Sequence, residues 1–525
     1  MMSFRRPRQY FAICLLALLS AIAFSQDNSS QSLGDVARKL RKEPSDEVRM
    51  TDADAKKLFD SVDQIFAFAS DDSGLPKHAT VKRRMVSRAD VEKYATGRMA
   101  REEYTKHFQV AELTMKKLGF LPREFKLREF LVKSTGQQIA GYYDDETKTI
   151  SLLNWVPADR QEPILAHELT HALQDQNYDL AKWMKAASRP EGTANKKEGE
   201  TENDDGAIAR KAVVEGQAMV VYVDYVLAPL GRNLSDTPGL IYQMEEPAVK
   251  AVQDSQMLHD APMILREAGS FAYNEGLIFE GELLQKGGKK MAFAGAFARP
   301  PRNSHEVLQP EAYINAEKLP PVGVPDLKQL IGEQYDVYDI GGVGQLDVRA
   351  YLKQYGDRRN AEDVSAAWQG GAYAAYRRRK ASSSDAELTT ADLATVYVSR
   401  WKTSQAASRF ARFYASTVPL RYQMATAQEP AACSGNKCPI AVAQYLTEEG
   451  PVVVEQWADN SVMVSESFDT ATALRIRDAV QDDEAGAHAE NTPQKELGLR
   501  LFELPAFQRF AEQVGAEILR EMQLH

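Results

Sequence analysis

Two histidines four residues apart, inside a stretch rich in apolar residues, constrain the fold of this chain most strongly. Residues 164–176 read Ile-Leu-Ala-His-Glu-Leu-Thr-His-Ala-Leu-Gln-Asp-Gln. On an α-helix, His167 and His171 would project from one face about one turn apart, and two imidazoles so placed can bind one zinc ion. Glu168 would lie about 100° further round the helix, where it can accept a proton from metal-activated water without being a ligand. The alternative is a helix that simply carries surface histidines.

A third ligand is needed, because a catalytic zinc ion normally binds three side chains and keeps one position open. The metzincin pattern requires a glycine and a histidine where this chain has Gln174 and Asn177. The next histidine after His171 is His259, so a glutamate from a second helix is the remaining common solution. Glu215 stands in an otherwise apolar helical stretch, where an unpaired carboxylate would be costly and a metal ion would offset that cost. Alternatively, Glu215 pairs with a buried arginine or reaches solvent.

The His-Glu-Leu-Thr-His motif, followed by a glutamate in Val-Glu-Gly, resembles the gluzincin metallopeptidases, the thermolysin-like clan. The resemblance implies a zincin-like domain in a protein of the α+β class. It implies that the zinc ligands are His167, His171 and Glu215, and that Glu168 is the catalytic base. A closer similarity, over about residues 125–320, is to a set of exported bacterial proteins with the same helix motif.

The resemblance also extends to the surroundings of the site. It implies that strands at 139–143 and 148–153 lie beside the site, one of them able to pair with an extended substrate backbone. The interval from His171 to Glu215 is longer than in thermolysin, which predicts an inserted surface loop at 187–205.

Two supporting roles have several candidates. A carboxylate commonly orients a zinc-bound imidazole, and either Asp175 or Asp224 could do so, although each also fits a surface acid or a helix cap. No residue maps onto the histidine that steadies the oxyanion in thermolysin. The candidates for that role, each of which also fits a structural role, are His259, His305, Tyr273 and Tyr313.

The N-terminus reads as a secretory signal peptide at residues 1–25. Arg5, Arg6 and Arg8 give a positive start, an apolar run follows, and Ala-Phe-Ser supplies small residues for cleavage. The apolar run is too short to span a bilayer of roughly 30 Å, so no stable membrane span is expected after cleavage. We therefore expect a periplasmic or extracellular protein; the alternative is an uncleaved anchor.

Cysteine usage agrees with export. Cys14 leaves with the signal peptide, while Cys433 and Cys438 flank Ser-Gly-Asn-Lys, a sequence suited to a tight loop. We expect a local disulfide between them in an oxidising compartment. A zinc site is the alternative, but it would need two further ligands.

Length and composition indicate several globular domains. The chain has 525 residues, 44% hydrophobic and 26% charged, with a formal net charge of −10. No long basic block occurs, so nucleic acid is not an expected partner. The pattern divides into a helical N-terminal region at 26–125, a zincin-like catalytic domain at 126–320 and a separate C-terminal α+β module at 325–525. That module carries no catalytic constellation and is expected to serve an unknown partner.

Hydrophobic periodicity and turn residues predict individual elements. A capping box formed by Asp159 and Glu162 is expected to begin the motif helix. Further helices are expected at 55–68, 207–226, 404–414 and 469–480. Strands are expected at 81–86, 395–400, 440–446, 452–457 and 462–465, with a hairpin turn at Asp459-Asn460.

The sequence therefore predicts an exported zinc metallopeptidase that hydrolyses peptide bonds in peptides or proteins by metal-activated water, with a glutamate as general base. Two alternatives remain. One is a non-catalytic binding or assembly protein on a zincin scaffold with a structural or vestigial metal. The other is a hydrolase of a different amide, such as a cell-wall cross-link.

Overall fold

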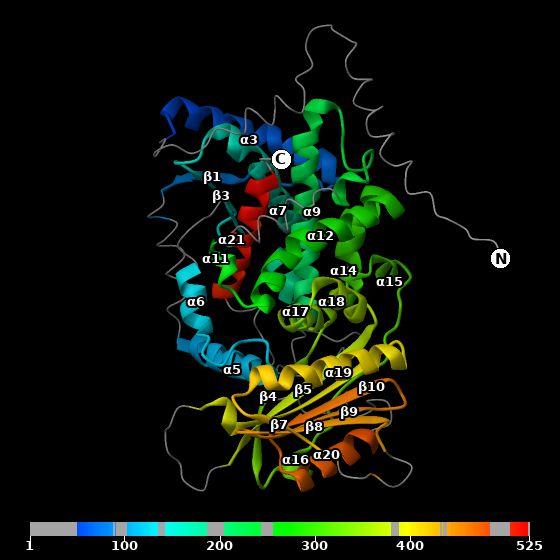
Figure 1. The fold of residues 1–525 in the computed structure, drawn as a ribbon. Coiled ribbons are helices and arrows are strands. Elements are labelled where there is room, and N and C mark those ends of the chain that lie inside the picture. The colour runs from blue at the N-terminus through cyan, green and yellow to red at the C-terminus, as the bar shows by residue number, and fades with distance from the viewer. Residues whose placement is uncertain are drawn as a thin grey trace, which may run out of the picture. The chain divides into compact units, whose positions relative to one another are not determined.

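The computed structural model describes residues 50–87, 90, 102–134, 142–185, 204–242, 256–379, 388–430, 433, 438–482 and 505–522 (Figure 1). These residues belong to one compact unit, which runs from Ser45 to Met522. They combine helices with two sheets, which confirms the predicted α+β class. The predicted signal peptide, most of the predicted loop at 187–205 and the start of the strand predicted at 139–143 lie outside the described residues.

A three-stranded sheet precedes the motif helix in the chain. Its order is β1-β3-β2, with β1 (Lys82–Val86) parallel to β3 (Thr149–Leu153) and β2 (Tyr142–Asp144) antiparallel to β3. This confirms the predicted strand near 81–86 and the predicted hairpin. All five residues of β3 are buried, whereas β2 forms an edge of the sheet.

The motif helix is α7 (Ala158–Tyr178), and it is tied to β3 by one side chain. The buried Gln161 accepts a hydrogen bond from the backbone N–H of Leu153 and donates to the Leu153 carbonyl. The capping box predicted at Asp159 is wrong, because the helix begins one residue earlier and its N-cap is Pro157, which makes no side-chain cap bond. Gln161 therefore takes over the anchoring of this helix start.

Two helices pack against α7, α3 (Asp52–Ser73) and α9 (Asp204–Leu227), and α12 (Met263–Lys290) packs in turn against α9. The backbones of α9 and α12 touch at Gly216 and Gly276. A Cβ atom on Gly216 would clash with the carbonyl of Gly276, and one on Gly276 would clash with the carbonyl of Ala212. This close crossing fixes the position of α9 next to residue 215.

Helix α9 is unusually apolar. Among the described residues, one helical segment, Asp205–Leu230, has the length and hydropathy of a membrane span, and 67% of its most apolar part is buried inside the structure. A helix that is apolar on all sides is also what a protein core requires.

A seven-stranded antiparallel sheet forms the second part of the fold, in the order β4-β5-β6-β10-β9-β8-β7. The strands and helices predicted here from the sequence are confirmed, including the hairpin turn at Asp459-Asn460 between β9 and β10. The strands are β4 (Tyr335–Gly342), β5 (Trp368–Arg378), β6 (Leu393–Trp401), β7 (Ala425–Gln428), β8 (Ala441–Thr447), β9 (Gly450–Gln456) and β10 (Ser461–Glu466).

Both faces of this sheet are covered. Along β6, Tyr397 packs edge-on against Phe410 of α19 (Ser404–Arg421), whereas Val396 and Val398 belong to a core cluster with residues of α16 (Lys328–Ile331) and α20 (Thr470–Asp482). Figure 1 shows α19 along one face and α16 and α20 along the other. Side chains alternate between the two faces along β6, so this strand contributes apolar residues to the packing on each face.

The remaining helices connect or cover these parts. They are α5 (Glu102–Leu118), α6 (Leu127–Ser134), α8 (Leu180–Lys185), η2 (Ala228–Leu230), α11 (Gln256–His259), η3 (Met291–Gly295), α13 (Ala296–Ala298), α14 (Ser304–Leu308), α15 (Pro310–Ile314), α17 (Gln345–Tyr355), α18 (Arg358–Ser365), η4 (Thr390–Asp392) and α21 (Pro505–Met522). Helix α21, at the end of the chain, packs against α12 and α6.

Buried charges join α5 to the seven-stranded sheet. The ammonium group of Lys117, fully buried in α5, donates to Glu449 at 2.7 Å and to Ser467 at 2.7 Å. Burial lowers the pKa of Lys117 to about 8, although Glu449 and Glu466 oppose this shift.

The expected disulfide between Cys433 and Cys438 is present, with Cα atoms 5.8 Å apart.

Candidate metal centre

The two histidines of the motif lie on one face of α7, as their spacing predicts. The Nε2 atoms of His167 and His171 are 3.1 Å apart. His167 is almost fully buried, at 2% exposed, and the side chain of His171 is 12% exposed. The pair therefore faces the interior of the protein. This excludes the alternative of a helix that simply carries surface histidines.

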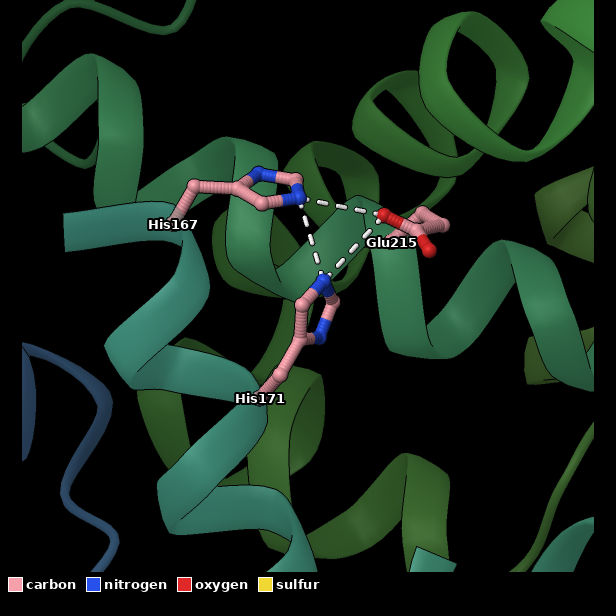
Figure 2. A group of neighbouring side chains, drawn as sticks. All are labelled: His167, His171 and Glu215. Carbon is pink, nitrogen blue, oxygen red and sulfur yellow. Dashed lines mark hydrogen bonds and ion pairs between the residues drawn. The ribbon is translucent and has the colours of Figure 1, made fainter. Parts of the chain in front are cut away.

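Glu215 of α9 completes this group. Its Oε2 atom lies 3.1 Å from Nε2 of His167 and 3.3 Å from Nε2 of His171. Figure 2 shows the two imidazoles and the carboxylate pointing toward one another from α7 and α9. Tetrahedral zinc with bonds of about 2.0–2.1 Å separates its ligand atoms by about 3.3–3.4 Å. The three donor atoms thus have the spacing of three corners of such a site.

The carboxylate of Glu215 is held from its other side. Nζ of Lys211, one turn earlier on α9, lies 2.6 Å from Oε1 of Glu215, so that Oε2 is the oxygen directed at the histidines. Burial alone would raise the pKa of Glu215, but Lys211 and His171 outweigh it and hold this pKa well below its usual value. Glu215 is therefore an anion, as a metal ligand must be.

Tyr273 of α12 also belongs to the site. Its ring stacks on the imidazole of His167, with centroids 6.2 Å apart and planes inclined by 14°. Burial raises the pKa of Tyr273 well above its usual value, and the Glu215 carboxylate adds to the shift, so the phenol is neutral. The Gly216–Gly276 crossing brings Tyr273, one turn before Gly276, to this position.

Glu168 lies beside the group but is not part of it. Its Oε2 accepts a hydrogen bond of 2.8 Å from the backbone N–H of Tyr143 in the edge strand β2. Burial raises the pKa of Glu168 to about 7, with His171 opposing and Glu215 adding to the shift. The structure thus brings the four predicted site residues together, with Glu168 next to the three donors.

Sequence reasoning missed the partner that orients His171. Nδ1 of His171 lies 2.9 Å from Oε1 of Gln174, three residues along α7. Asp175, a candidate for this role, instead accepts hydrogen bonds from the Tyr143 hydroxyl at 2.8 Å and from Lys148 at 2.6 Å. An i, i+3 search from each histidine for any hydrogen-bonding side chain, amides included, would have found Gln174.

The second orienting candidate, Asp224, lies elsewhere on α9. Its Oδ1 accepts a hydrogen bond from the backbone N–H of Leu234. It faces Asp72 of α3, whose carboxylate pairs with Lys289 of α12 at 2.7 Å. Burial, and then the charge of Asp72, raise the pKa of Asp224 from 3.8 to about 7. Asp224 is thus a buried carboxyl group beside a second, partly buried one.

Replacing Asp224 with asparagine is expected to stabilise the protein at alkaline pH. A raised pKa in the folded state means that stability present below about pH 4 is lost as the pH rises to about 7. Asparagine carries no charge, still accepts from Leu234 and can donate to Asp72. We expect the free energy of unfolding to rise by about 1–3 kcal/mol at pH 8 and to change little at about pH 4. Urea unfolding at both pH values measures this, and equal changes at the two would contradict it.

Among the four candidates for the oxyanion role, the structure brings Tyr273 to the cluster. The side chain of His259 is exposed and contacts Asp260, Nδ1 of His305 bonds to Gln345, and the hydroxyl of Tyr313 donates to the Arg299 carbonyl. These contacts lie outside the group formed by His167, His171 and Glu215.

Comparison with known proteins reaches a different part of the chain. Residues 334–477 match a family model described as "Domain of unknown function (DUF8575)". The matched residues include the seven-stranded sheet and contain none of His167, His171 and Glu215. No curated protein and no solved structure matches the chain.

Proposed function

We propose that this protein is an exported zinc-dependent metallopeptidase of the gluzincin type, with a zincin-like domain around α7 and α9. The observation that carries the proposal is the triangle of Nε2 of His167, Nε2 of His171 and Oε2 of Glu215, whose sides of 3.1–3.3 Å fit tetrahedral zinc. The donor set itself, two imidazoles and one carboxylate, is that of a catalytic site with an open position, whereas structural zinc sites bind four side chains. This favours an enzyme over a binding protein with a structural metal.

The residues divide the chemistry among themselves. A bound zinc ion supplies Lewis acidity, which polarises the scissile carbonyl and acidifies water. Glu168 would accept a proton from the attacking water and later deliver it to the leaving amine. The bond from the Tyr143 N–H holds its carboxylate in place. The edge strand β2, which carries Tyr143, is the element on which an extended peptide would add as a further strand.

Export is part of the same proposal. The arginines and apolar run at 1–25 have the pattern of a signal peptide, and the disulfide between Cys433 and Cys438 is of the kind that persists in oxidising compartments. The C-terminal module, which contains the seven-stranded sheet, would bind a partner that is still unknown.

Metal removal tests the proposal. The chain lacking residues 1–25 is expected to contain about one zinc ion per molecule and to hydrolyse an unfolded protein such as casein. A chelator should abolish the activity and added zinc should restore it. Peptidoglycan serves as a second substrate, and cleavage of it alone would move the proposal to a cell-wall amide. The double variant His167→Asn/His171→Asn is the control for contaminating peptidases. Zinc-free protein, or hydrolysis that survives in the control, would overturn the proposal.

A further inference from the structure

A chain of buried amides leads from His171 to the backbone of another helix. Oε1 of Gln174 lies 2.9 Å from Nδ1 of His171. Nε2 of Gln174 donates to Oε1 of Gln217 at 3.1 Å and to the Val214 carbonyl at 3.0 Å. Nε2 of Gln217 donates to the carbonyls of Ala292 at 2.8 Å and Phe293 at 3.1 Å. Gln174 and Gln217 are both fully buried; together we call them the glutamine relay.

The carbonyls at the far end dictate the direction of every bond in the relay. A carbonyl oxygen can only accept, so the end of Gln217 that faces Ala292 and Phe293 must be its NH₂ group. Its oxygen must then face Gln174. Gln174 in turn must present its NH₂ group to that oxygen and to the Val214 carbonyl. The oxygen of Gln174 is left for His171, whose Nδ1 must therefore carry the hydrogen.

The two terminal carbonyls belong to an irregular turn. They lie in η3, a π-helical turn that follows Gly288, where α12 is interrupted by backbone angles of φ 65° and ψ −171°. Only glycine adopts this conformation readily. π-helical turns shift the pattern of backbone hydrogen bonds and often occur at functional sites. Here the turn supplies two acceptors that the side chain of Gln217 can reach.

We propose that Gln174 and Gln217 are positioning residues that fix the tautomer of His171, so that the lone pair of its Nε2 atom points at the metal before any metal arrives. This inference rests on the proposed function, since it concerns the same site. His167 provides an internal contrast, because its Nδ1 atom is buried and has no hydrogen-bond partner in the described part of the chain. Among the described residues, no side chain therefore fixes the tautomer of His167 through its Nδ1 atom.

The tautomer can be measured without metal or substrate. In metal-free protein with ¹⁵N-labelled histidine, imidazole nitrogen shifts distinguish Nδ1–H from Nε2–H. The measurement is made at pH 9, because the carboxylate of Glu215 outweighs burial and raises the pKa of His171, and the neutral ring is required. The variant His171→Asn identifies the resonances. The unaltered site is expected to show His171 as the Nδ1–H tautomer alone.

Removing the acceptor of His171 should release this preference. Gln174→Met matches the size of glutamine without its hydrogen bonds, so Nδ1 of His171 loses its acceptor. We expect His171 to populate both tautomers and the zinc dissociation constant to rise by about 10- to 100-fold, as for loss of a group that orients a ligand. Gln217→Met leaves the Val214 carbonyl as an acceptor for the Gln174 NH₂ group, so it should shift both quantities in the same direction but by less. Gln174→Glu keeps an acceptor for Nδ1–H and should retain the tautomer.

Gln176→Met is the matched control. Gln176 lies on α7 but binds the backbone of His78 and Ala79, away from the site. It should leave both the tautomer and the zinc affinity unchanged. An unaltered His171 tautomer in folded Gln174→Met would overturn the inference, even if the protein binds zinc and hydrolyses peptides. Absence of zinc binding with the tautomer as expected would instead count against the proposed function.

Discussion

Replacing Glu168 with glutamine is expected to lower kcat by about 10²–10⁴-fold and to leave the zinc content at one ion per chain. Glutamine has the shape of glutamate, and its carbonyl oxygen can still accept the hydrogen bond from the Tyr143 N–H. It cannot take up a proton from water, however, so the step that forms the nucleophile loses its base. Initial rates on a casein or peptide substrate, together with metal analysis of the same sample, measure both quantities.

Asp159→Asn is the control for this variant. It removes one negative charge from the same helix, but Asp159 is exposed and lies in the first turn of α7, more than one turn before His167. Its activity should equal that of the unaltered protein. If Glu168→Gln retains full activity in a preparation free of host peptidases, Glu168 is not the base.

Replacing Glu215 with glutamine is expected to raise the zinc dissociation constant by more than 100-fold. Loss of a group that merely orients a ligand costs about 10- to 100-fold, so loss of the ligand itself should cost more. Lys211 makes the effect severe, because its ammonium group will attract the amide oxygen into the place of Oε1. The NH₂ group then faces the two histidines, and it cannot bind a metal. Titration against a competing chelator gives the affinity.

A second, partly buried carboxylate separates metal loss from general destabilisation. Glu267 of α12 pairs with Lys353 at 2.9 Å and with Arg349 at 3.0 Å, and attraction to these two cations outweighs burial and lowers its pKa. Glu267→Gln should reduce the free energy of unfolding yet keep the zinc. Unchanged zinc affinity in Glu215→Gln would assign the third ligand to another residue.

The parts of the site that the sequence predicted depend on local periodicity. His167 and His171 share a face because four residues make about one helical turn, and this holds wherever the helix lies. Glu215 was recognisable because a carboxylate in an apolar helix requires a partner. Four strands of the seven-stranded sheet, β6, β8, β9 and β10, were recognisable in the same way, from apolar runs between turn residues such as Asp459-Asn460, whereas β4, β5 and β7 were not predicted.

The parts that were not predicted depend on contacts between distant segments. Gln217 has no distinguishing pattern in the sequence, and its role comes from carbonyls of residues 292 and 293, about 75 positions away. The start of α7 was misjudged for a related reason, since Gln161 binds β3 and Pro157 takes the cap position that Asp159 was expected to influence. Asp224 was misjudged because its neighbour Asp72 comes from another helix.

Direct contact between the backbones of α9 and α12 leaves the protein no room to evolve larger residues at Gly216 or Gly276. A methyl group at either position would wedge the helices apart and carry Glu215 away from Tyr273. In the proposed enzyme, a change of peptide preference would therefore come from the edge strand β2, whereas a side chain at either glycine would displace a proposed metal ligand. The proposed metal site and the proposed peptide-binding strand thus depend on different parts of the chain.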